Sequence, residues 1–242
     1  MAKRLPHLEF ACADHSKEVW FVRHKFRDAM SQIGATRFVD ILNRSVFKGT
    51  GWEGASLEPF LEHLHRNRTG IARQLQQRAP AIRRRWKRYE RAFFEQTQTV
   101  TGVAWRRRRY RAILIYSCFW GGDYDSEGNV YVSPSVRYGD PLYVVYHEMS
   151  HLLYWEFVRS ISSEAFIRRA FTPLWQLSEI MVNYPLLKLR IGFRFPLILP
   201  PDLPGRKTIL AQFPTRSYRE IIQSEVARIR VRARRAQALR SR

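Results

Sequence analysis

The residues with the clearest chemical meaning are the five consecutive residues His147-Glu148-Met149-Ser150-His151. Histidines four positions apart lie on one face of an α-helix, so both imidazoles can be directed at a single metal ion. The carboxylate of Glu148 follows the first imidazole and can accept a proton from a water molecule that the metal activates. Nitrogen and carboxylate ligands with one open position are typical of catalytic Zn²⁺. The pattern therefore predicts zinc as the cofactor and hydrolysis as the chemistry.

These residues need a buried helix to hold them, and the sequence predicts one from Pro141 to about Arg159. Asp140 is a favourable N-cap and Pro141 a favourable first helical residue. Apolar residues flank the motif at Val144, Val145, Leu152 and Leu153. The alternative interpretation is that the two histidines are core or surface residues that bind no metal.

A strand, an HExxH helix and a glutamate on a following helix occur in this order within residues 110–185. This order resembles the zincin-like metallopeptidases of the gluzincin type. The resemblance implies a short sheet whose edge strand lies beside the HExxH helix and pairs with an extended polypeptide substrate. The alternating segment Asn129–Ser133 matches the position of that edge strand. The resemblance also implies that Glu148 acts as general base and then as general acid.

We expect the third metal ligand to lie after His151 in the sequence. No histidine occurs there, which excludes the metzincin pattern and leaves carboxylates. Glu179 lies 28 residues after His151, in a largely apolar predicted helix, and this spacing fits the gluzincin pattern. Glu164, at the break after the first helix, is the alternative ligand. The alternative role for Glu179 is that of a solvated helix carboxylate.

A hydrolase of this kind also needs a group that stabilises the oxyanion. Many gluzincins use a Tyr, His or Arg beyond the third ligand, so the resemblance implies such a group here, and Tyr184 and Tyr218 are both candidates. The alternative interpretation is that both tyrosines only pack in the core.

The charge of the chain is strongly positive and unevenly distributed. The 42 Lys and Arg exceed the 21 Asp and Glu, which gives a net charge of +21. Residues 80–111 carry a net +9 and residues 186–242 a net +11, whereas residues 112–185 carry a net −4. Cationic surfaces attract polyanions, so the Arg-rich segments 80–111 and 228–242 predict contact with nucleic acid or another polyanion. The alternative is a solvated basic face.

The remaining features set the class of the protein. The 242 residues suffice for a substantial core, and no run of about 18 apolar residues predicts a transmembrane helix. No secretory signal is visible, so we expect a cytoplasmic protein. We predict an α+β fold, mostly helical, with a helical N-terminal region over 1–100. A zincin-like catalytic region with a basic C-terminal helix is predicted over 101–242.

Two functional hypotheses follow from the sequence. The first is a zinc metallopeptidase that hydrolyses peptide bonds. The second is a basic nucleic-acid-binding protein whose zincin-like domain is inactive or structural. The two would merge in a peptidase acting on DNA-associated proteins, as SprT-like proteases do. However, that family's third histidine ligand and cysteine-based zinc ribbon are missing here, since Cys12 and Cys118 are the only cysteines.

Overall fold

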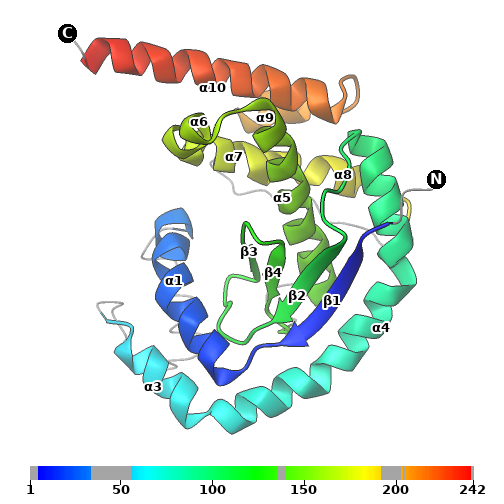
Figure 1. Ribbon diagram of the computed structural model, residues 1–242, viewed down its shortest axis with the longest axis vertical. Coiled ribbons are helices and arrows are strands. Elements are labelled where there is room, and N and C mark those ends of the chain that lie inside the picture. Colours follow the sequence, from blue (N-terminus) through cyan, green and yellow to red (C-terminus); the bar gives the residue numbers. More distant parts are fainter. Residues whose placement is uncertain (1–4, 34–55, 136–139, 192–202, 204, 241–242) are drawn as a thin grey trace. The chain divides into compact units, whose positions relative to one another are not determined.

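The computed structural model describes residues 5–33, 56–135, 140–191, 203 and 205–240 (Figure 1). Over these residues the fold is α+β and mostly helical, with a four-stranded sheet, as the sequence predicts. The chain divides into two compact units. One comprises residues 1–7, 89–108 and 149–242, and the other comprises residues 8–88 and 109–148. No described helix is both long enough and apolar enough to cross a membrane.

The sheet belongs to the second of these units. Its strands are β1 (His7–Cys12), β2 (Arg109–Leu114), β3 (Gly122–Tyr124) and β4 (Asn129–Val132), in the spatial order β1-β2-β4-β3. β4 runs parallel to β2 and antiparallel to β3. The buried residues of β2 and β4 form the centre of this sheet.

The prediction that Asn129–Ser133 forms the edge strand is wrong. β4, which contains most of Asn129–Ser133, lies between β2 and β3. The edge position belongs to the three-residue strand β3, because the short turn after Tyr124 returns the chain antiparallel along β4. At the other edge lies β1, a strand in a region that the sequence predicts as helical. The alternation of apolar and polar residues within a segment identifies a strand, but it does not identify the strands that pair with it.

Three helices of the second unit pack around the sheet and each other. They are α1 (His15–Ile33), α3 (Glu58–Arg66) and the first part of α4 (Arg68–Thr101). The rings of Phe21 and Tyr131 lie 5.1 Å apart and join α1 to β4, and Phe26 lies equally close to Phe60 of α3.

Helix α4 corrects a second expectation. The sequence predicts one helix that ends near residue 79 and another that begins at Pro80, whereas α4 continues through Pro80. A proline inside a helix removes one backbone hydrogen bond. Buried side chains on both sides of it, including Leu75, Ile82 and Trp86, keep the helix continuous.

The other unit consists mainly of helices over its described residues. It holds most of α5 (Pro141–Ile161) and then α6 (Glu164–Arg169), α7 (Phe171–Met181), α8 (Asn183–Lys188), α9 (Arg206–Leu210) and α10 (Tyr218–Arg240). α5 and α7 are joined where the Tyr154 hydroxyl donates to the carbonyl of Leu174 at 2.9 Å. The predicted HExxH helix and the predicted basic C-terminal helix are confirmed as α5 and α10.

Candidate metal centre

Helix α5 is a buried helix whose start is fixed by its own sequence. The backbone N–H of Leu142 donates to the Asp140 carboxylate at 2.9 Å, which confirms the predicted N-cap. Arg85 donates to the same carboxylate at 3.0 Å. Most side chains between Leu142 and Val158 are buried, including the apolar residues on both sides of the HExxH motif. The histidines are therefore held by a helix that packing restrains on several faces.

Three of the predicted residues come together. His147 and His151 lie one turn apart on α5, and α7 adds Glu179 beside His151. One ligand atom from each residue lies within 4.8 Å of the other two, and this group could hold a metal ion. The third-ligand candidate chosen from spacing is thus next to the histidine pair.

The distance between His151 Nε2 and Glu179 Oε1 is 3.4 Å. Ligand atoms bound to a tetrahedral zinc at 2.0–2.1 Å lie about 3.3 Å from each other. A direct N–H···O hydrogen bond is usually shorter, at about 2.7–3.2 Å. The separation therefore suits two atoms that share an ion, and the donor set of two imidazoles and one carboxylate fits zinc.

Burial changes the charge of these groups. Desolvation lowers the pKa of His147 to about 4, so this imidazole is neutral at pH 7, the form that binds metals. Desolvation also raises the pKa of Glu179 to about 8. A nearby cation favours the charged form of a buried carboxyl group, and a bound metal ion would act on Glu179 in this way.

Glu148 lies against a glycine of the edge strand. Its side chain is buried, and the backbone of Gly122 in β3 passes close to its carboxylate. A Cβ atom added at Gly122 would collide with Glu148 Oε1 and lie 2.7 Å from its Cγ. The same atom would lie 2.5 Å from Cγ1 of Val144. Only glycine leaves room for the carboxylate here, which the sequence alone does not reveal.

Tyr143 lies near the site, although it is not among the residues predicted from the sequence. Its hydroxyl lies 3.5 Å from Nδ1 of His147, and the two rings are 5.9 Å apart. A polar group near the second nitrogen of a metal-binding imidazole helps to orient the ring. The four-residue spacing before His147 on the same helix is the signal that could have identified it.

Of the remaining site candidates, Tyr184 and Glu164 have polar partners elsewhere, and Tyr218 is packed in the core. The Tyr184 hydroxyl donates to the carbonyl of Arg216 at 3.0 Å and accepts from Lys188 at 2.8 Å, so its proton is already used. The oxyanion role of Tyr184 stays a prediction. Tyr218 is buried with its ring 5.4 Å from that of Tyr184. Glu164 is largely exposed in α6, with Arg159 at 3.8 Å.

Several arginines of the predicted polyanion-binding segment 80–111 bind other groups of the chain. Arg83 donates to the carbonyl of Phe10 at 3.0 Å. Arg85 pairs with Asp140, and Arg91 pairs with Glu95 at 2.8 Å. These contacts leave fewer arginines of this segment for an external anion.

Compared with protein-family models, with characterised proteins and with solved structures, the chain matches none. Function must therefore be argued from the chemistry of the site itself.

Proposed function

We propose that this protein is a zinc-dependent metallopeptidase of the gluzincin type, with His147, His151 and Glu179 as metal ligands. The observation that carries the proposal is the grouping of these three ligand atoms within 4.8 Å of one another. Glu148, adjacent to His147 in the sequence, provides the base that hydrolysis needs. A buried pair of histidines with only a structural role would not require a carboxylate at 3.4 Å, the separation typical of ligands that share an ion.

Zinc bound by these residues would lower the pKa of a coordinated water toward 7 and polarise the carbonyl of the substrate. Glu148 takes the proton of the attacking water and returns it to the leaving amine. The contact with Gly122 limits where the Glu148 carboxylate can move, so the base stays on one side of its helix. Tyr143 helps to orient His147 through the ring nitrogen that faces its hydroxyl.

The edge of β3 supports an extended polypeptide as the substrate. The antiparallel hydrogen bonds between β3 and β4 use Gly121 and Asp125, which pair with Ser133 and Asn129. Because these bonds alternate along a strand, the N–H and C=O of Gly122 point away from β4. A substrate strand can pair with them beside Glu148. At Tyr124 the same edge is already occupied, since Lys25 donates to its carbonyl at 2.9 Å.

The test combines metal analysis with an activity assay. Protein purified without chelator should contain one zinc per chain and hydrolyse an unfolded protein substrate. His147→Ala should lose the zinc, because it removes one of two ligands on a rigid helix. Glu148→Gln should keep the zinc and lose hydrolysis, because an amide cannot accept the proton. Zinc content near zero that added zinc does not restore would refute the proposal.

The second candidate function is a nucleic-acid-binding protein whose zincin-like domain is inactive or structural. It is favoured by the cluster of arginines between α6 and α10. The Glu148→Gln variant separates the two functions, because it removes peptide hydrolysis and leaves binding of a polyanion unchanged.

A further inference from the structure

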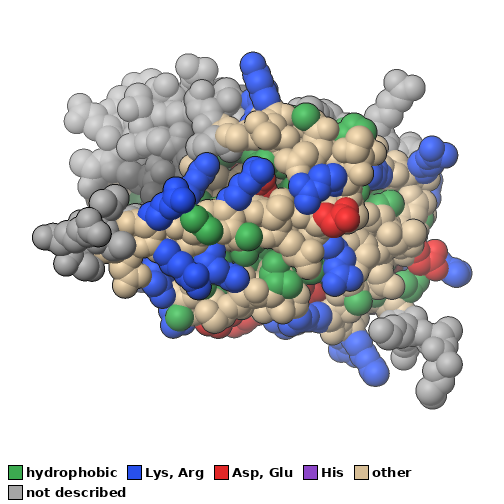
Figure 2. Space-filling view, turned by 90° about the horizontal axis from the view of Figure 1, so that it is seen from above, with side chains coloured by type: hydrophobic (Ala, Val, Ile, Leu, Met, Phe, Trp, Pro, Cys, Tyr) green, Lys and Arg blue, Asp and Glu red, His purple; other side chains and the backbone are tan. Residues whose placement is uncertain are grey.

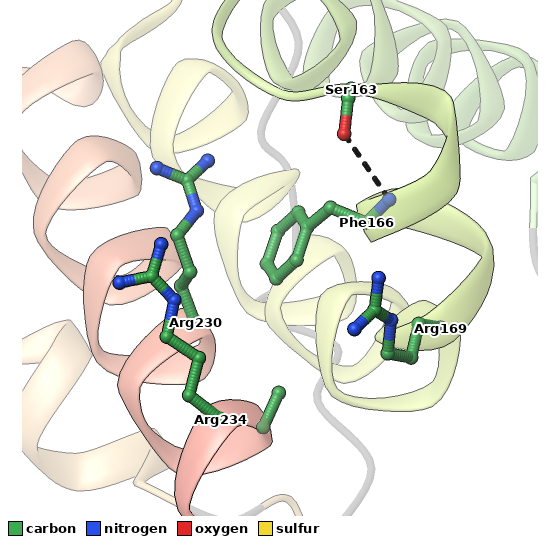
Figure 3. A pocket seen from close by; sticks show the side chains of 6 residues that line it. Ser163, Phe166, Arg169, Arg230 and Arg234 are labelled. Carbon is green, nitrogen blue, oxygen red and sulfur yellow. Dashed lines mark hydrogen bonds between the residues drawn. The ribbon is translucent and has the colours of Figure 1, made fainter. Parts of the chain in front are cut away.

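A second candidate site is a pocket of about 390 Å³ in the helical unit (Figure 3). It lies between α6 and α10, both of which follow the HExxH helix in the sequence. Its lining residues are Ser163, Phe166, Arg169, Arg230, Ala233 and Arg234. Figure 3 shows Arg169 on one wall, Arg230 and Arg234 on the other, and the ring of Phe166 between the walls.

The three arginines of this pocket have no carboxylate partner among the described residues. Arg230 lies over the Phe166 ring at 4.9 Å, and one of its nitrogens is 3.4 Å from the carbonyl of Ile161. Arg169 donates to the side chain of Gln237 at 3.1 Å. By contrast, Arg228 of α10 is paired with Glu225 at 2.7 Å. The pocket therefore collects positive charge that the described part of the chain does not neutralise.

The chemistry of this pocket suits a phosphate group. Guanidinium groups bind phosphate oxygens through charge-assisted, often bidentate, hydrogen bonds. A volume of about 390 Å³ lies within the range of sites that hold a whole small molecule and exceeds the need of one free phosphate. The space therefore fits a phosphate together with the groups attached to it.

The surroundings extend the positive charge beyond the pocket. Helix α10 carries seven arginines and two glutamates between Tyr218 and Arg240. Figure 2 shows Lys and Arg side chains spread over the visible face, with fewer Asp and Glu. A ligand with repeated phosphates can contact the pocket and the exposed arginines of α10 at once.

We propose that this pocket binds a backbone phosphate of a single-stranded nucleic acid. A flexible single strand can turn one backbone phosphate into a concave site, whereas bending a duplex to do the same costs free energy. Arg169 and Arg234 contact the phosphate, and Arg230 is held against Phe166 as the third positive group. The proposal is independent of the metallopeptidase function, because none of the lining residues belongs to the metal cluster.

The test measures binding of a fluorescein-labelled oligonucleotide of about 20 nucleotides by anisotropy, at about 50 and 200 mM salt. The double variant Arg169→Gln/Arg234→Gln should bind about tenfold more weakly or worse at low salt. Its plot of log affinity against log salt should be shallower by about one, because fewer counterions are released. Both side chains are exposed, so the variant should keep the thermal stability of the wild type.

The matched control is the double variant Arg228→Gln/Arg232→Gln, which removes the same charge from α10 outside the pocket. It should change affinity by no more than about twofold to threefold. An equal loss of affinity in both double variants would refute binding in the pocket and would indicate non-specific electrostatic attraction by α10. Absence of oligonucleotide binding would also overturn it. Binding to phosphatidylserine vesicles without oligonucleotide binding would assign the surface to a membrane instead.

Discussion

At the scale of single residues, the proposed metal centre depends on a carboxyl group in an apolar helix. Glu179 lies in α7 among the buried residues Leu177, Ile180 and Met181. Burial raises the pKa of Glu179 to about 8, so the carboxyl group keeps its proton near neutral pH unless a cation replaces it. Zinc binding should therefore release a proton from this residue.

Glu179→Gln should weaken zinc affinity by at least the roughly 10- to 100-fold that changes in outer-shell partners cause. The amide keeps the size of the side chain but is a much poorer zinc ligand than a carboxylate. Competition with a chromogenic chelator measures the affinity. Glu164→Gln is the control, because its side chain is largely exposed beside Arg159 and should leave affinity unchanged. The reverse result would contradict the gluzincin assignment.

At the scale of elements, strand β3 and helix α5 meet where Gly122 faces Glu148. The strand has only three residues, and its pairing with β4 fixes its position. A side chain at Gly122 would have to displace both Glu148 and Val144. The absence of a side chain at Gly122 therefore allows β3 to approach α5 closely.

Gly122→Ala should lower peptide hydrolysis strongly while zinc content stays at that of the wild type. The added methyl group overlaps Glu148 Oε1 and Cγ1 of Val144, and such overpacking costs about 1–3 kcal/mol of stability. Zinc analysis, activity and urea unfolding measured on the same preparation separate these effects. Full activity in this variant would show that Glu148 is not constrained by β3.

A second prediction at this scale concerns Glu18 of α1. Its carboxylate accepts from the backbone N–H groups of Tyr116 at 2.7 Å and Ser117 at 2.9 Å, so it joins α1 to the segment after β2. Burial raises the pKa of Glu18 to about 7. The folded state therefore binds this proton more tightly than the unfolded state, whose pKa is near 4.5.

The contribution of Glu18 to stability is present below about pH 4.5 and is lost as pH rises through 7. The loss amounts to about 3 kcal/mol from 1.36 kcal/mol per pKa unit. Urea unfolding at several pH values should show this fall in the wild type. Glu18→Gln should remove it, because the amide does not titrate in this range, although the variant starts less stable by about 1–3 kcal/mol. Identical pH dependence in both proteins would exclude Glu18 as its source.

The elements that are predicted correctly are those whose sequence signals lie within or directly beside the element. Asp140 and Pro141 mark the start of α5 by capping chemistry, and the spacing from His151 to Glu179 places a carboxylate on α7. The position of β4 inside the sheet depends on which strands pair with it, and no residue within Asn129–Val132 encodes that choice. Gly122 escaped prediction for the same reason, since its neighbour Glu148 is distant in sequence.

At the scale of the whole chain, charge is sorted along the sequence. The proposed metal ligands and Glu148 lie within residues 112–185, whose net charge is −4, although the chain carries +21. A cation site needs nearby acids and few competing cations, which suits this segment. The arginine pocket draws two of its three arginines from α10, in the segment with a net charge of +11.

Zinc at about 100 times its dissociation constant should stabilise the folded chain by about 2.7 kcal/mol. For a chain of this length, that corresponds to a rise in Tm of roughly 5–10 °C. Thermal unfolding with zinc and with chelator measures the difference. His147→Ala is the control and should unfold at the same temperature in both conditions. A wild-type Tm that does not change with zinc would contradict the proposed metal centre.

The burial of His151 has a kinetic consequence. Its side chain is 2% exposed, and Glu179 beside it on α7 is 15% exposed. A chelator can approach a bound ion through the open position that the substrate would use, but the buried His151 and Glu179 release the ion only when α5 and α7 separate locally. The rate of zinc loss should therefore become independent of chelator concentration once chelator is abundant. That limiting rate measures how often these two helices separate, and the protein needs no label for the measurement.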